Sequence, residues 1–161
     1  GWVENLTARG NPFAGLFLFA SSLEAQNVDL AANSYGALVE LNSSLALDYG
    51  NVADNVYGVF ADQDTQVSLV GLDIHDNMIG LALDGASAWI TGCGSHDNST
   101  SLDTYLTFGA RADFASGNDM GNVVCDGTCL TRGDAGCGFS FTDAMPAIPE
   151  RQRVGPFPRE P

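Results

Sequence analysis

The chain has 161 residues, with 20 acidic against 6 basic side chains and a formal net charge of −14. All six basic residues are Arg, so few groups can neutralise phosphates, and nucleic acid is excluded as an expected partner. The hydrophobic content of 45% is enough for one folded domain, and no apolar run reaches the roughly 20 residues that span a bilayer.

A 22-residue repeat covers positions 1–98. Each repeat has an Asn followed after three residues by Gly, or after four in the first repeat. The Asn residues are separated by 22, 22, 22 and 21 positions. They are Asn11, Asn33, Asn55, Asn77 and Asn98, and the Gly residues are Gly15, Gly36, Gly58 and Gly80. This regular step predicts a solenoid with one repeat per coil.

Three pairs of apolar residues lie between one Asn and the next. In the third repeat they are Val59 and Ala61, Val67 and Leu69, and Leu72 and Ile74. Each pair alternates with polar or small residues, which is the period of a strand. Three short strands per coil, with no helical stretch between them, predict an all-β, single-stranded solenoid. Equivalent residues of successive coils are expected to stack in ladders.

The corner residues have structural roles in this prediction. Stacked Asn side chains can pass amide hydrogen bonds from coil to coil and satisfy turn backbone groups that would otherwise be buried unpaired. The Gly residues, including Gly36, Gly58 and Gly80, are expected because the corner needs a backbone conformation that costs other residues energy.

The pattern Asn-x-x-Gly followed by alternating apolar residues resembles the repeats of the pectate-lyase-like proteins. The resemblance covers residues 1 to about 98 and implies a right-handed parallel β-helix. Members include polysaccharide lyases, polygalacturonases, epimerases, phage tailspikes and adhesins. The resemblance therefore implies a fold rather than a reaction.

Three parts of the chain are expected. Residues 1–124 form the coils, regular to 98, with a last coil over 99–124 that carries a loop insertion. This insertion is the segment STSLDTYLTF, because the next plausible corner Gly is Gly109. A Cys-rich C-terminal cap covers 125–145, and an extended or disordered tail covers 146–161. Residues 1–11 match the end of a coil, so the chain is expected to be the C-terminal part of a longer β-helix and to pack on its N-terminal coils.

Four cysteines are disulfide candidates: Cys93, Cys125, Cys129 and Cys137. One or two bridges would place the protein in an oxidising compartment, so it is expected to be secreted or at the cell surface. A zinc site is the alternative, but the cysteine spacing is poor for zinc and no His lies nearby.

Two acidic ladders are candidate binding sites. The first follows the corner Gly, is a candidate ligand-binding groove, and comprises Glu40, Asp62, Asp84 and Asp113. The second precedes the corner Asn, is a candidate metal site, and comprises Asp54, Asp76 and Asp97. Carboxylates stacked about 4.8 Å apart repel unless they are solvated, protonated or bridged by a cation, and Ca²⁺ is the natural bridge. A solvated acidic face, or capping of turn backbone by the second set, are the alternatives.

Four other side chains are candidates. His75 and His96 both occur in the tripeptide His-Asp-Asn, and could be a general-base pair, a metal pair or ordinary surface residues. In the predicted insertion, Tyr105 and Phe108 could stack on sugar rings or fold over the core.

The repeats come without a recognisable acid, base or nucleophile set. The leading hypothesis is a non-catalytic segment of a secreted or cell-surface β-helix protein, acting as a carbohydrate-facing or adhesive scaffold with a polysaccharide or surface glycan as partner. The alternative is a polysaccharide-active enzyme, a lyase, glycoside hydrolase or epimerase, that uses the acidic groove. The chain has no Lys to serve as the base of a lyase, and the motifs of polygalacturonases are absent.

Overall fold

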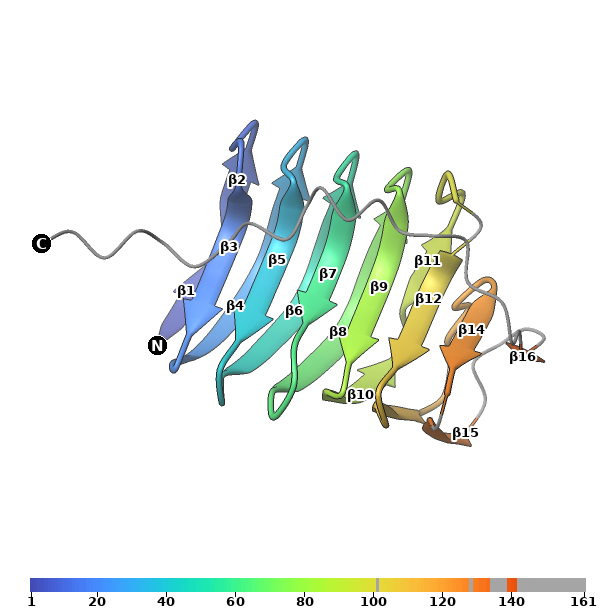
Figure 1. Cartoon of the computed structure of the whole chain (residues 1–161). Coiled ribbons are helices and arrows are strands. Elements are labelled where there is room, and N and C mark those ends of the chain that lie inside the picture. Colours follow the sequence, from blue (N-terminus) through green and yellow to red (C-terminus); the bar gives the residue numbers. More distant parts are fainter. Residues whose placement is uncertain (101, 128, 134–138, 142–161) are drawn as a thin grey trace, which may run out of the picture.

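The computed structural model describes residues 1–100, 102–127, 129–133 and 139–141. Every regular element in these ranges is a β-strand. The strands run parallel and stack as a β-solenoid of about six turns (Figure 1). The predicted all-β solenoid is confirmed.

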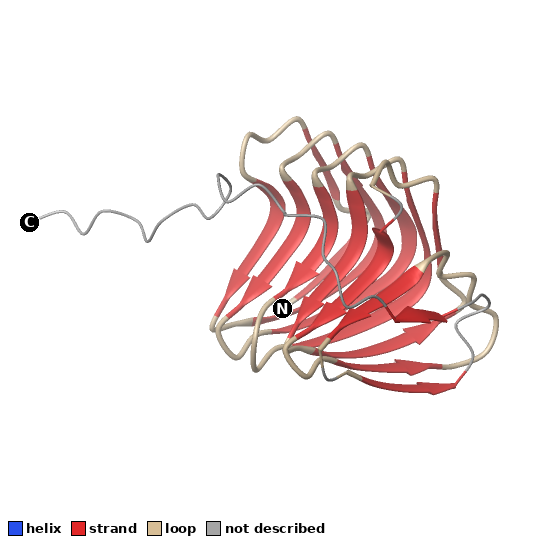
Figure 2. Ribbon diagram, turned by 45° about the vertical axis from the view of Figure 1, so that its right-hand side comes forward, coloured by secondary structure: helices blue, strands red, loops and turns tan. Residues whose placement is uncertain are grey.

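Two parallel sheets run along the stack (Figure 2). Within the described residues the first sheet has nine strands: β1 (Trp2–Glu4), β2 (Thr7–Arg9), β4 (Ser22–Ala31), β6 (Ser44–Ala53), β8 (Gln66–His75), β10 (Ser87–Thr91), β11 (Gly94–His96), β13 (Arg111–Phe114) and β15 (Leu130–Gly133). The second has seven: β3 (Ala14–Phe19), β5 (Tyr35–Glu40), β7 (Tyr57–Ala61), β9 (Ile79–Asp84), β12 (Leu102–Thr107), β14 (Val123–Asp126) and β16 (Phe139–Phe141).

The prediction of three short strands per coil holds in some coils and needs amendment in others. In the middle coils, the second and third predicted strands join into the ten-residue strands β4, β6 and β8. Each of these bends at one residue, where pairing skips a position and φ is positive: Asn27 at 52°, Tyr49 at 59° and Gly71 at 60°. Elsewhere the bend separates two strands, β1 from β2 and β10 from β11.

Inward-facing aliphatic residues form the core. Leu45 pairs with Leu23 and with Val67, 22 positions away in each direction, so the predicted register is confirmed. The side chains of Leu47, Leu69 and Ile90 are fully buried along one such ladder. Burying each side chain of this size contributes about 1.5–3 kcal/mol. The ladders therefore hold the coils together along the whole stack.

The corner Asn residues form the predicted ladder. The backbone N–H and the side-chain amide of Asn55 both donate to Oδ1 of Asn77, each at 3.0 Å. The amide of Asn55 also donates to the carbonyl of Leu30 at 2.9 Å. Asn33 donates in the same way to Asn55, so the pattern repeats from coil to coil. These bonds satisfy buried turn groups, which confirms the structural role predicted for Asn.

The corner Gly is required for a different reason from the one predicted. Gly36, Gly58 and Gly80 do not have positive φ. A Cβ on Gly58 would instead lie 2.4 Å from the carbonyl oxygen of Gly80, because the corners of successive coils approach closely. The left-handed conformation falls one residue before each Asn, where φ is 56° at Asp54 and 54° at Asp76.

The insertion after Asn98 is shorter than expected, because most of the segment predicted as a loop is a strand. Residues 102–107 form β12, and Leu106 pairs with Leu83 on β9. Asp103 stands where the earlier coils have the corner Gly, and its Oδ1 accepts hydrogen bonds from the N–H and amide of Asn98. The alignment on Gly109 failed because this coil has no corner Gly, and a carboxylate ends the Asn ladder instead.

The C-terminal part continues the parallel pairing past residue 124. β14 pairs with β12, and β16 pairs with β14. Cys125 and Cys129 form a disulfide, as two of the predicted candidates. Cys93 is a free thiol buried in the core, so its prediction as a disulfide residue is wrong. Cys137 and the predicted tail over 146–161 lie outside the described residues.

Candidate functional site

The first predicted acidic ladder is only partly one ladder. Glu40 and Asp62 end strands β5 and β7 or follow them directly, and the pKa of Glu40 is raised by burial and then by the charge of Asp62. Asp84 pairs with Thr107 in the next coil, not with Asp113. Asp113 lies on β13 of the other sheet, opposite Trp89, so grouping it with Asp84 was wrong.

Tyr105 and Phe108 do not lie together on a binding loop. Tyr105 is on β12 and is 5% exposed, and its hydroxyl donates to Oδ2 of Asp126 at 3.3 Å. Burial, followed by the charge of Asp126, raises the pKa of Tyr105 to about 12. Phe108 follows the strand at the corner and is 72% exposed. A buried phenol cannot stack on a sugar, so only Phe108 stays available for the predicted role.

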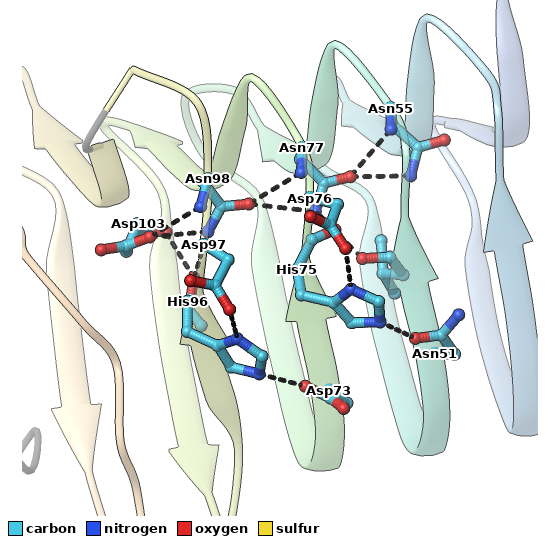
Figure 3. Close-up of polar contacts among 12 residues, drawn as sticks. Asn51, Asn55, Asp73, His75, Asp76, Asn77, His96, Asp97, Asn98 and Asp103 are labelled. Carbon is cyan, nitrogen blue, oxygen red and sulfur yellow. Dashed lines mark hydrogen bonds and ion pairs between the residues drawn. The ribbon is translucent and has the colours of Figure 1, made fainter.

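A group of hydrogen-bonded His and Asp side chains lies at the Asn corner (Figure 3). His75 ends β8 and His96 ends β11, and the two residues pair in one column of the stack on adjacent strands. Their rings stack with centroids 5.6 Å apart and planes 9° apart. Each His is followed by an Asp with positive φ, a conformation that Asp tolerates better than most residues. This turn brings the Asp carboxylate back onto the imidazole.

His96 is held between two carboxylates. Its Nδ1 lies 3.0 Å from Oδ2 of Asp97, and its Nε2 lies 2.8 Å from Oδ1 of Asp73 on β8 (Figure 3). An ionised carboxylate only accepts hydrogen bonds, so the two bonds form together only when both ring nitrogens are donors, as they are in the imidazolium. The pKa of His96 is raised, chiefly by its hydrogen bond to Asp97 and also by Asp73, against the smaller opposing effect of burial.

His75 has one carboxylate and one amide as partners. Its Nδ1 lies 2.7 Å from Oδ2 of Asp76, and its Nε2 lies 2.8 Å from the side-chain oxygen of Asn51. An amide can donate as well as accept once its two ends are exchanged. The amide of Asn51 therefore gives His75 a hydrogen-bond partner without adding a second negative charge beside the ring.

The partners Asn51 and Asp73 were missed from the sequence. They occupy one column of the first sheet, two residues before the His column, and each contacts a His of the following coil. At the start of the same two columns, the guanidinium of Arg9 donates to Asp29 at 2.9 Å. The 22-residue register applied to His75 and His96 would have found these partners.

A shallow, open groove of about 600 Å³ runs along the same corner, across several coils. Two of the predicted metal residues, Asp54 and Asp76, line one part of it. Val56 and Met78 supply apolar surface, and Ser34 supplies a hydroxyl. Asp97 instead contacts His96, as described above.

The corner is poorly arranged for a metal. Both nitrogens of each imidazole are already hydrogen bonded, so a metal would have to displace a partner. In the part of the chain that the structure describes, no three His, Cys, Asp or Glu side chains are grouped to hold a metal ion. What the corner offers is a row of hydrogen-bond acceptors along a groove with mixed polar and apolar lining.

The sequence matches no family model, and no curated protein or solved structure matches the chain. Among the described residues there is also no helix that could cross a membrane. The functional interpretation therefore depends on the geometry of the solenoid itself.

Proposed function

We propose that this chain is a non-catalytic, carbohydrate-facing or adhesive segment of a secreted or cell-surface β-helix protein. The observation that carries the proposal is the corner groove lying beside imidazoles whose nitrogens are all hydrogen bonded. A general base needs a free lone pair within reach of its substrate. The corner thus supplies contacts for a ligand without a free base to act on it.

The groove suits an extended, neutral or positively charged glycan. Carbohydrate sites combine apolar surface with a few well-placed polar groups. Val56 and Met78 provide the apolar surface. The carboxylates of Asp54 and Asp76 can accept hydrogen bonds from the hydroxyl or amino groups of a glycan. Because the chain carries a net charge of −14, a polyuronate would be repelled. Neutral and amino-sugar polymers are the favoured partners.

Two further features support the remaining parts of the proposal. The bridge between Cys125 and Cys129 is typical of an oxidising compartment, which favours a secreted or surface location. The repeat with its stacked Asn corner favours a relationship with the pectate-lyase-like proteins.

One observation favours the enzymatic alternative. The raised pKa of Glu40, next to Asp62, is a property that general acids share. A polysaccharide lyase, hydrolase or epimerase would then use the carboxylates of the second sheet, including Asp84. This alternative lacks a partner base at a defined position.

One experiment separates the two functions. The chain is incubated with neutral, amino-sugar and uronic-acid polysaccharides, and both retention and release of soluble products are measured. The proposal expects retention of neutral or amino-sugar polymers, weakened when Asp54→Asn and Asp76→Asn are combined, and no product. Product release that Asp84→Ala abolishes would establish the enzyme instead.

A further inference from the structure

Three exposed aromatic rings lie along the first sheet, away from the second. Trp2 on β1, Tyr49 on β6 and Trp89 on β10 are 59%, 60% and 48% exposed. Trp89 points outward, because both of its neighbours along the strand, Ala88 and Ile90, belong to the core. Successive pairings place Trp2 and Trp89 in the same column, four strands apart. At a strand spacing of about 4.8 Å, they stand roughly 19 Å apart.

The β8 surface between Tyr49 and Trp89 is small and uncharged, and Asp48, which pairs with Val70, borders it on the Tyr49 side. Ser68 pairs directly with Trp89, and Val70 and Thr91 form the next outward-facing pair. Tyr49 leans over Gly71 of the following coil, since a Cβ on that Gly would lie 2.6 Å from the Tyr ring. Glycine at this bend therefore lets the ring lie close to the sheet surface. An uncharged patch of this kind stands out on a chain with a net charge of −14.

A carboxylate borders the patch. Asp113 on β13 pairs with Trp89, so the two side chains are neighbours across adjacent strands. Its Oδ1 is buried and has no hydrogen-bond partner among the described residues. Asp113 was predicted from the sequence to bind ligand, and it is the predicted residue that lies beside an exposed Trp.

We propose that Trp89, Tyr49 and Asp113 form a docking surface for a neutral polysaccharide on the outer face of the first sheet. Aromatic faces bury the apolar C–H surfaces of sugar rings. The half-buried carboxylate of Asp113 borders the rings, and its solvent-facing side, not the buried Oδ1, is the part that can accept a hydrogen bond from a sugar hydroxyl. Because the rings lie on strands β6 and β10, with β8 between them, they fit an extended chain rather than a single sugar. The inference depends on the proposed carbohydrate-facing function and adds a second contact surface, on a different face from the corner groove.

Tryptophan fluorescence gives a direct test on the full 161-residue chain. The chain has two Trp residues, so in the Trp2→Phe variant the emission reports Trp89 alone. The variant is titrated with cello-, chito- and laminari-oligosaccharides, and retention on insoluble cellulose and chitin is measured in parallel. A change in Trp89 emission is expected with at least one neutral series. Trp89→Ala and Tyr49→Ala should each weaken binding about tenfold, as for central contacts of an interface.

Phe19→Ala is the matched control, because it removes an aromatic ring of similar exposure, 54%, from β3 on the second sheet. It should leave binding unchanged, and Trp89→Phe should retain most of it; far-UV circular dichroism checks that each variant is folded. Binding that survives both alanine substitutions, or that only Asp54→Asn with Asp76→Asn weakens, would overturn this docking surface and leave the proposed function standing. If no polysaccharide binds the unmodified chain, both proposals fail.

Discussion

The imidazole of His96 stacks on that of His75, and the two rings differ in their second partner: a carboxylate, Asp73, for His96, and an amide, Asn51, for His75. Asn51 and Asp73 occupy the same column one coil apart. A single exchange of nitrogen for oxygen between neighbouring coils thus gives one ring two anionic partners and the other ring only one. The asymmetry places more negative charge beside His96, whose pKa is raised.

The stability of this corner should depend on pH through His96. Its pKa in the folded protein is raised above the ordinary value of 6.5, so the folded state binds the proton more tightly than the unfolded state. The contribution is therefore fully present below pH 6.5 and is lost as the pH rises through the folded pKa. We expect the thermal stability difference between the natural chain and His96→Gln to shrink across that interval.

The Asp97→Asn variant provides the control for this effect, because the hydrogen bond to Asp97 is the largest cause of the raised pKa. NMR titration of the His96 ring should give a pKa above 6.5 in the natural chain and a lower value in Asp97→Asn. A His96 ring that titrates at or below the ordinary value would show that it is not held as an imidazolium.

Removing one Asn from the middle of the ladder should lower the free energy of unfolding far more than removing one from its start. Asn77 is fully buried; it accepts two hydrogen bonds from Asn55 and donates to the carbonyl of Val52. Asn77→Ala leaves several of these groups buried and unpaired, which should lower the free energy of unfolding by about 3 kcal/mol. Asn11 is half-buried at the first corner, so Asn11→Ala should lower the free energy of unfolding by less than about 1 kcal/mol. Urea denaturation of both variants measures the difference, and equal losses would contradict a cooperative ladder.

The repeat could be predicted because inward aliphatic residues and corner Asn residues are constrained by every neighbouring coil. A change at such a position leaves a cavity or an unpaired group, so the same residue types recur there in successive repeats. The coil after Asn98 could not be aligned, because Asp103 occupies the place of the corner Gly. Its carboxylate accepts a hydrogen bond from Asn98, and a pattern built on Gly does not detect this residue. The reason for Gly58 was also hidden, since only the packed coils show how closely its neighbour's carbonyl approaches.

Surface chemistry was predicted less well for a related reason. Outward-facing residues contact only one or two neighbours, so nothing in the period of the sequence marks them. Asn51 and Asp73 became recognisable only as partners of the His residues. The exposure of Trp89 was hidden in the same way, because a Trp between two apolar residues reads equally well as core.

The corner Gly should be irreplaceable for steric reasons alone. In Gly58→Ala the new methyl would lie 2.4 Å from the carbonyl oxygen of Gly80, a backbone atom that cannot move without shifting the next coil. We expect a loss of about 2 kcal/mol or more in the free energy of unfolding, as for other overpacked sites. Gly94 is the control, because it has ordinary φ and no atom nearer than 3.6 Å to an added Cβ. Gly94→Ala should change stability by less than about 0.5 kcal/mol, and a comparable loss at both positions would refute the close-approach explanation.

The thiol of Cys93 should be unreactive until the solenoid opens. It is 1% exposed, its sulfur accepts a hydrogen bond from the N–H of Leu72 at 3.5 Å, and burial raises its pKa. Only the thiolate reacts with thiol reagents, so burial and the raised pKa both slow the reaction. In a Cys137→Ser background, Cys93 should stay unlabelled at about pH 8 in the native protein and react on unfolding. In the same background, the Ser99→Cys variant places a thiol at an exposed position, and this thiol should react at once. A similar rate for Cys93 would mean that the core around β10 and β11 opens readily.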